Sequence, residues 1–83
     1  MFIAQIQIMP KTELLDPAGK AVLATLQNHL DLGAAKDVRV GKLVTLKIEA
    51  ASKEEAEKIA KEASDKLIVN QVMEDYTFTV EAL

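Results

Sequence analysis

The chain contains no cysteine and no tryptophan, and it has only three glycines, two prolines and one histidine. Without cysteine it can form neither a disulfide nor a thiolate metal site, so a reduced, cytoplasmic setting is the natural expectation. Three scattered glycines do not make a glycine-rich phosphate-binding loop. These absences remove several common routes to catalysis and cofactor binding.

Positive charge and long apolar runs are also lacking. The net charge of −3 argues against nucleic acid as a partner, because nucleic acid is bound through a basic surface. No apolar run approaches the roughly 18 residues of a membrane-spanning helix. The first residues, MFIAQIQIMPK, lack the basic start of a secretory signal. We therefore expect neither a nucleic-acid partner nor a membrane partner.

Hydrophobic residues are abundant, at 49% of the 83 positions, which is too many for a disordered chain. We assign residues 1–83 to a single small domain. Domains of this size bury a modest fraction of their surface, and disulfides, metals or oligomerisation commonly support them. With no cysteine, oligomerisation is the support that remains.

The central stretch, residues 36–50, is the most informative part of the chain. Its sequence, KDVRVGKLVTLKIEA, places Val38, Val40, Val44, Leu46 and Ile48 on even positions. This period of two predicts one long strand, bent or bulged at Gly41. A hairpin with a three-residue loop at Gly41 would keep the same phase and is the alternative.

The length of this strand has a consequence. At about 3.3 Å per residue it would reach roughly 45–50 Å, whereas a domain of this size has a diameter of roughly 30 Å. The strand would extend beyond its own domain, and its apolar face would need a second chain to cover it. We therefore predict an obligate homodimer built along this strand.

The remaining elements follow from capping and periodicity. Alternating residues predict strands over 3–9 and 72–82. Asp16-Pro17 predicts a helix to about Leu30, and Ser52 with Glu55 forms a capping box for a helix to about Ile68. The first helix carries an apolar stripe at a spacing of four, Ala18, Val22, Leu26 and Leu30, widened by Leu23 and Ala21. The inward stripe of the second helix is Ala56, Ile59, Ala60, Ala63 and Leu67.

Together these elements predict an α+β fold with the order β-α-β-α-β, a two-layer sandwich with both helices on one face of an antiparallel sheet. If the central strand splits in two, the order becomes the ferredoxin-like βαββαβ.

No catalytic, cofactor-binding or metal-binding constellation is apparent. His29 falls near the end of a helix, where a surface position explains it, and Ser52 is explained by capping. The most suggestive residues are Arg39, Gly41 and Lys42, at the predicted bend of the central strand. Their charges could pair with another protein or protect a strand edge. We take these three residues as the candidate interface of a binding or structural module.

Five ordered segments resemble the PurS family, the small subunits of phosphoribosylformylglycinamidine (FGAM) synthase. They are Ile8-Met9-Pro10-Lys11, LDPAGKA at 15–21, DVRVGK at 37–42, EAEK at 55–58, and Val72 with EDY at 74–76. The resemblance covers essentially the whole chain. This sequence departs from the family at Thr12-Glu13, where Pro-Gly is frequent, and at Asn70-Gln71, where Asn-Pro is frequent.

The resemblance implies a chain without a catalytic centre of its own, forming a homodimer or higher oligomer. It would assemble with a large synthetase subunit, PurL, and a glutaminase subunit, PurQ. That complex makes FGAM in de novo purine biosynthesis, with ATP and magnesium used by the synthetase subunit. The small subunit would bridge the other two and assist ammonia transfer. No cofactor would bind to this chain.

A different class of function shares the same predicted fold. A small ferredoxin-like regulatory module would bind a metabolite at the seam of a dimer. An independent enzyme is disfavoured, because nucleophile, base and metal ligands are not found together.

Overall fold

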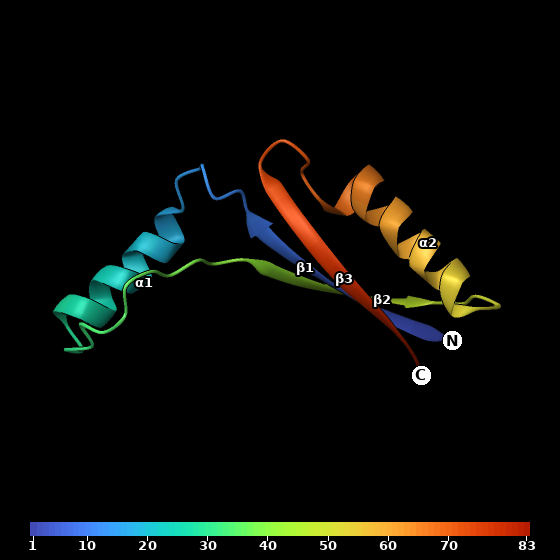
Figure 1. Ribbon diagram of the computed structural model, residues 1–83, viewed down its shortest axis with the longest axis horizontal. Coiled ribbons are helices and arrows are strands. Elements are labelled where there is room, and N and C mark those ends of the chain that lie inside the picture. Colours follow the sequence, from blue (N-terminus) through green and yellow to red (C-terminus); the bar gives the residue numbers. More distant parts are fainter.

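The computed structural model describes all of residues 1–83. Three strands, β1 (Phe2–Pro10), β2 (Lys42–Ile48) and β3 (Glu74–Ala82), form one antiparallel sheet in the order β2-β1-β3 (Figure 1). Helix α1 (Pro17–Asn28) joins β1 to β2, and helix α2 (Lys53–Ala63) joins β2 to β3. The predicted α+β class and the β-α-β-α-β order are confirmed.

The central strand β1 has the alternation that its sequence predicts. Ala4, Ile6 and Ile8 are almost fully buried, whereas Gln5 and Gln7 on the opposite face are exposed. In the register, Ile6 lies opposite Val44 on one side and Phe78 on the other. One face of the sheet is therefore apolar and the other faces solvent.

Helix α2 covers the apolar face of the sheet. Its start is fixed by the predicted capping box, with the hydroxyl of Ser52 accepting the N–H of Glu55 at 3.2 Å and the Glu55 carboxylate accepting the N–H of Ala51 at 3.3 Å. Ala56 and Ala60 are fully buried against Ala4, Ile48 and Val80. These small side chains let the helix backbone approach the strands closely.

Helix α1 does not join this layer, so the prediction of two helices on one face of the sheet is wrong for the single chain. Figure 1 shows α1 standing away from the sheet, at the far end of the molecule from α2. Only Gly19 is buried in this helix, and Val22 is 44% exposed. The apolar stripe of α1 is present but has no partner within the chain.

The strand predicted over residues 36–50 is shorter in the structure. Strand β2 begins at Lys42, and residues 36–41, which we call the arm, form no ladder with another strand. The hairpin alternative is also wrong, because β2 pairs only with β1 and the ferredoxin-like split strand does not form within the chain. In Figure 1 the arm continues from β2 toward α1 as an extended segment. It keeps the predicted direction but lacks a strand beside it to complete the ladder.

A π-helical turn, Ser64–Ile68, follows α2 and changes which residues face the core. Its wider turn bonds the N–H of Val69 to the carbonyl of Ser64 at 3.0 Å. Val69 is consequently buried beside Ile6 and Ile8, while Leu67 is 85% exposed. The prediction that Leu67 points inward is therefore wrong.

The molecule is elongated, with Cα extents of 51 × 27 × 13 Å and a radius of gyration of 16.4 Å. A compact domain of this length would have a radius of about 12 Å. Only ten of the 83 residues are buried. The chain therefore consists of two parts, the sheet with α2 and a projecting part formed by α1 and the arm.

Candidate functional site

The two parts meet at a joint that contains the candidate interface residues. Its centre is Asp16, which lies just before α1. One carboxylate oxygen accepts the N–H of Gly19 at 3.0 Å and caps the helix, and the other accepts the N–H of Val40 in the arm at 2.9 Å. These two donors, with Arg39 nearby, hold the pKa of Asp16 below its ordinary value. One side chain thus ties the start of α1 to the arm.

Arg39 faces into the joint. Its guanidinium donates a hydrogen bond to the carbonyl oxygen of Pro10, and its Nε lies 4.0 Å from the carboxylate of Asp16. Its side chain is 26% exposed. The charge of Arg39 is therefore largely engaged within the chain, connecting the end of β1 to the arm.

Two glycines permit this close approach of backbones. A Cβ added at Gly19 would collide with the carbonyl oxygen of Val38. A Cβ added at Gly41 would collide with the Met9 sulfur and the carbonyl oxygen of Ile8. Neither glycine has a positive φ angle, so steric room rather than backbone conformation requires glycine at both positions.

Lys42 lies at the edge of the joint, and its side chain is more accessible than that of Arg39. Its ammonium group lies 3.0 Å from the carboxylate of Glu74 on β3, and its side chain is 61% exposed. The N–H of Asn70 donates to the same carboxylate at 2.9 Å, and the two contacts lower the pKa of Glu74. Lys42 therefore presents charge to solvent, whereas Arg39 and Gly41 hold the chain together.

An open hollow of about 500 Å³ lies beside the joint. It is formed by the loop 12–16 and the arm residues 37–39, with Lys20 of α1 at its border. Its lining mixes three carboxylates with two basic groups. No group of three or more histidine, cysteine or acidic side chains in the chain could hold a metal ion.

The single histidine and the two serines of the chain have structural roles or lie on the surface. His29 is exposed at the C-terminal cap of α1, and the hydroxyl of Ser64 donates to the carbonyl of Ala60 at 2.8 Å. Ser52 caps α2 as predicted. No helix has the length and hydrophobicity needed to cross a membrane.

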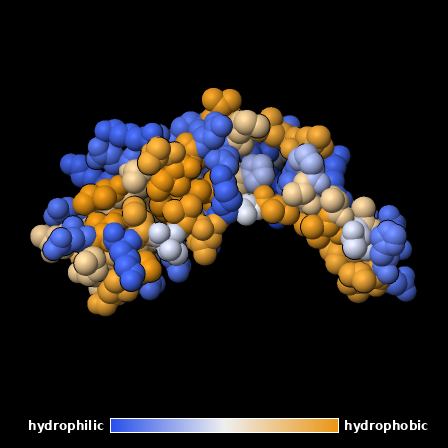
Figure 2. All heavy atoms as spheres, turned by 180° about the vertical axis from the view of Figure 1, so that it is seen from behind, coloured by the Kyte–Doolittle hydropathy of each residue, from blue (hydrophilic) through white to orange (hydrophobic).

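Sequence reasoning missed one exposed apolar surface and could have identified another. On α1, a shallow hollow of about 360 Å³ is lined by Ala21, Val22, Thr25, Leu26 and Leu30. The spacing of these residues already predicted an apolar stripe, although not its exposure. Figure 2 shows hydrophobic side chains over both parts of the molecule. The surface that sequence reasoning missed lies on the connection between α2 and β3. The π-helical turn in this connection gives no signal in the sequence.

Comparison with known proteins gives full-length matches. The family described as PurS, phosphoribosylformylglycinamidine (FGAM) synthase, matches residues 3–82. The FGAM synthase subunit PurS of Bacillus subtilis is 35% identical over 81 residues, covering 98% of this chain and 94% of that protein.

Solved structures of the same family have the same fold. The crystal structure of Methanocaldococcus jannaschii PurS, a subunit of formylglycinamide ribonucleotide amidotransferase in the purine biosynthetic pathway, superposes with a TM-score of 0.87 at 29% identity and covers 100% of this chain and 99% of that one. A chain in the structure of PurLQS from Thermotoga maritima gives a TM-score of 0.87 at 31% identity, with 96% of each chain covered.

Proposed function

The chain belongs to the PurS family of FGAM synthase subunits, and from this premise we propose that it bridges the synthetase subunit PurL and the glutaminase subunit PurQ in purine biosynthesis. The match over residues 3–82 carries the proposal. A similar chain occurs in the PurLQS structure of Thermotoga maritima, which supports association with both partners. The chain itself would perform no chemical step.

The bridging role has a physical purpose. Glutamine hydrolysis releases ammonia, which becomes mostly ammonium in neutral water and then no longer acts as a nucleophile. A subunit that holds the glutaminase against the synthetase can keep ammonia away from bulk water. ATP and magnesium would be used by the synthetase subunit, and no cofactor would bind to this chain. The complex would act in the cytoplasm.

We propose further that the functional form is a homodimer or a higher oligomer. The apolar stripe of α1 is exposed in the single chain, and Val44 and Leu46 on the α2-covered face of the sheet are only partly buried. An α1 helix from a second copy could cover this part of the sheet, as helices cover a sheet in other two-layer folds. The elongated shape and the small number of buried residues support this arrangement.

Reconstitution with purified PurL and PurQ tests the bridging role. FGAM formation would be measured with glutamine and, separately, with ammonium chloride as the nitrogen source. We expect the glutamine-dependent rate to require this chain and the ammonium-dependent rate of PurL to be much less sensitive to it. Equal glutamine-dependent rates with and without the chain would contradict the proposal.

A further inference from the structure

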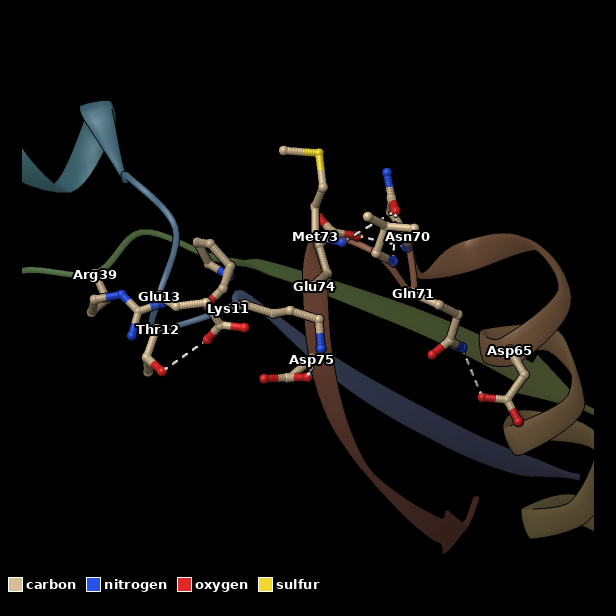
Figure 3. A network of polar contacts seen from close by, with 12 residues as sticks. Lys11, Thr12, Glu13, Arg39, Asp65, Asn70, Gln71, Met73, Glu74 and Asp75 are labelled. Carbon is tan, nitrogen blue, oxygen red and sulfur yellow. Dashed lines mark hydrogen bonds and ion pairs between the residues drawn. The ribbon is translucent and has the colours of Figure 1, made fainter.

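Methionine is the side chain of this protein that peroxide oxidises most readily, because the sequence contains no cysteine and no tryptophan. Of the three methionines, Met1 and Met73 are 60% and 52% exposed, and Met9 is 37% exposed. Figure 3 shows the side chain of Met73 pointing away from the strands. An oxygen atom added to the sulfur of Met73 would therefore disturb little, whereas the surroundings of Met9 are different.

The sulfur of Met9 lies against the backbone of Gly41. Strand β1 pairs with β2 as far as Ile8, which lies opposite Lys42, so Met9 and Gly41 are the next residues beyond the end of this ladder. A Cβ added at Gly41 would collide with the Met9 sulfur. The Met9 side chain therefore covers the point at which the arm leaves the sheet.

The contacts that hold the arm and the end of β1 surround this point. Pro10, the residue after Met9, has its carbonyl oxygen bound to the guanidinium of Arg39 in the arm. On the other side of β1, Met9 lies opposite Asp75. The carboxylate of Asp75 binds the ammonium group of Lys11 at 2.8 Å (Figure 3). A displacement of Met9 would therefore affect the arm and the end of β1 together.

An open hollow of about 130 Å³ adjoins Met9 on the solvent face of the sheet. Gln7 and Thr77 line this hollow together with Met9. The amide group of Gln7 carries two N–H donors, and the hydroxyl of Thr77 is a third donor. The hollow gives a small peroxide a route to the Met9 side chain. It also has room and hydrogen-bond donors for the oxygen of a sulfoxide.

We propose that Met9 is a site of reversible oxidation by peroxide that opens the joint. The lone pair of the sulfur attacks one oxygen of hydrogen peroxide, so that an S–O bond forms as the O–O bond breaks. The leaving hydroxide takes up the remaining proton and becomes water, and the two electrons lost by sulfur are gained by the peroxide. A sulfoxide reductase reverses the step by oxidising a dithiol of its own to a disulfide and releasing the oxygen as water.

Oxidation should open the joint because the added oxygen has no room beside Gly41. The sulfoxide fits when the side chain turns into the hollow lined by Gln7 and Thr77, and this movement takes the sulfur away from Gly41. The sulfoxide is also polar, so it packs less well than the thioether. The arm then loses its cover at the end of β1, and α1 loses its fixed position relative to the sheet.

Peroxide treatment of the folded chain tests this proposal. Wild type, Met9→Leu and the matched control Met73→Leu would each be treated, and the sulfoxide at each methionine would be quantified by peptide mass spectrometry. Leucine is close to methionine in volume but cannot be oxidised. The melting temperature and the rate of trypsin cleavage after Arg39 would then be measured. Both quantities follow the joint itself, so they do not depend on the bridging function.

We expect oxidised wild type and oxidised Met73→Leu to melt roughly 4–8 °C below the untreated proteins. Trypsin should cleave both after Arg39 about fivefold faster, because the arm opens locally. Oxidised Met9→Leu should match its untreated form, and a methionine sulfoxide reductase should restore the oxidised wild type. A folded chain without sulfoxide at Met9, or equal losses in wild type and Met9→Leu, would overturn the proposal.

A second measurement decides the matter without a variant, in case Met9→Leu is itself unstable. Partially oxidised wild type would be digested briefly with trypsin, and the sulfoxide content of the cleaved and uncleaved fractions would be compared. Sulfoxide at Met9 should be enriched in the fraction cleaved first, whereas sulfoxide at Met73 should be evenly distributed. An even distribution of Met9 sulfoxide between the two fractions would also overturn the proposal.

Discussion

The carboxylate of Asp16 accepts the backbone N–H of Val40 at 2.9 Å, across 24 residues of sequence. The same carboxylate caps α1 through Gly19. The start of the helix and the arm are therefore held by one side chain, and the position of α1 relative to the sheet depends on it.

Replacing Asp16 should loosen the joint. Asp16→Ala removes both accepted hydrogen bonds, so we expect its melting temperature to fall by several degrees. Asp16→Asn keeps one oxygen acceptor, so its melting temperature should fall by an intermediate amount. Thermal unfolding at pH 7 measures both. Equal melting temperatures for all three proteins would show that the joint does not contribute to stability.

The same carboxylate gives a pH dependence with a defined sign. The pKa of Asp16 is lower in the folded chain than in the unfolded chain. Its contribution to folding stability is therefore fully present above the unfolded pKa of about 3.9. The contribution is lost as the pH falls through the folded pKa. The wild type should therefore lose its stability advantage over Asp16→Asn on acidification below pH 4, as measured by denaturant unfolding at several pH values.

Gly41 should tolerate no side chain. Gly41→Ala places a methyl group against the carbonyl of Ile8 and the sulfur of Met9, and we expect a loss of about 1–3 kcal/mol in the free energy of unfolding. Gly33 is the matched control, because a Cβ there meets no atom within 4 Å. Gly33→Ala should be neutral or slightly stabilising. Similar losses for both variants in urea titrations would contradict the steric explanation.

A charge on the exposed stripe of α1 should separate the oligomer. Leu26→Asp would bury a carboxylate in the proposed contact, and at about 3 kcal/mol this weakens dimerisation on the order of 100-fold. Leu26 is half-buried, whereas Ala24 is exposed on the other side of the helix, so Ala24→Asp should have little effect. Sedimentation equilibrium over a dilution series measures both. A wild-type chain that remains monomeric at every concentration would disprove the dimer.

Replacing Arg39 with alanine and replacing Lys42 with alanine should have different effects on stability. Arg39→Ala removes a contact within the joint and should lower stability, whereas Lys42→Ala removes an exposed ion pair of about 0–1 kcal/mol. If Lys42 contacts a partner, Lys42→Ala should weaken complex assembly without a change in melting temperature. Unchanged dimerisation and assembly in the double variant would exclude both residues from the interface.

Local features of the fold were predictable from the sequence, and features that depend on other chains were not. The alternation of Ala4, Ile6 and Ile8, and the capping of α2 by Ser52, follow from neighbouring residues alone. The stripe of α1 was also visible, but an apolar stripe does not specify whether the covering surface belongs to the same chain. Leu67 was misplaced because a single wider helical turn shifts the register without altering the apolar pattern.

The length of the strand predicted over residues 36–50 was overestimated for a related reason. Val38 and Val40 keep the alternation of β2, yet hydrogen bonding requires a neighbouring strand, and β1 ends at Pro10. The sequence selected Arg39, Gly41 and Lys42 together as a candidate interface, which stays a prediction, and only the structure separated the inward Arg39 from the outward Lys42. Periodicity defines which residues share a face but not how far the ladder extends.

The central position of β1 also shapes how the chain must fold. Its two neighbours lie far along the sequence, with Phe2 opposite Ile48 on one side and Ala82 on the other. No hairpin of consecutive strands is available as an early nucleus, so large loops must close before any ladder forms. Refolding should therefore be slow for a protein of this length. In a newly made chain, the pairing of β3 with β1 would depend on α2, which connects β3 to the rest of the sheet.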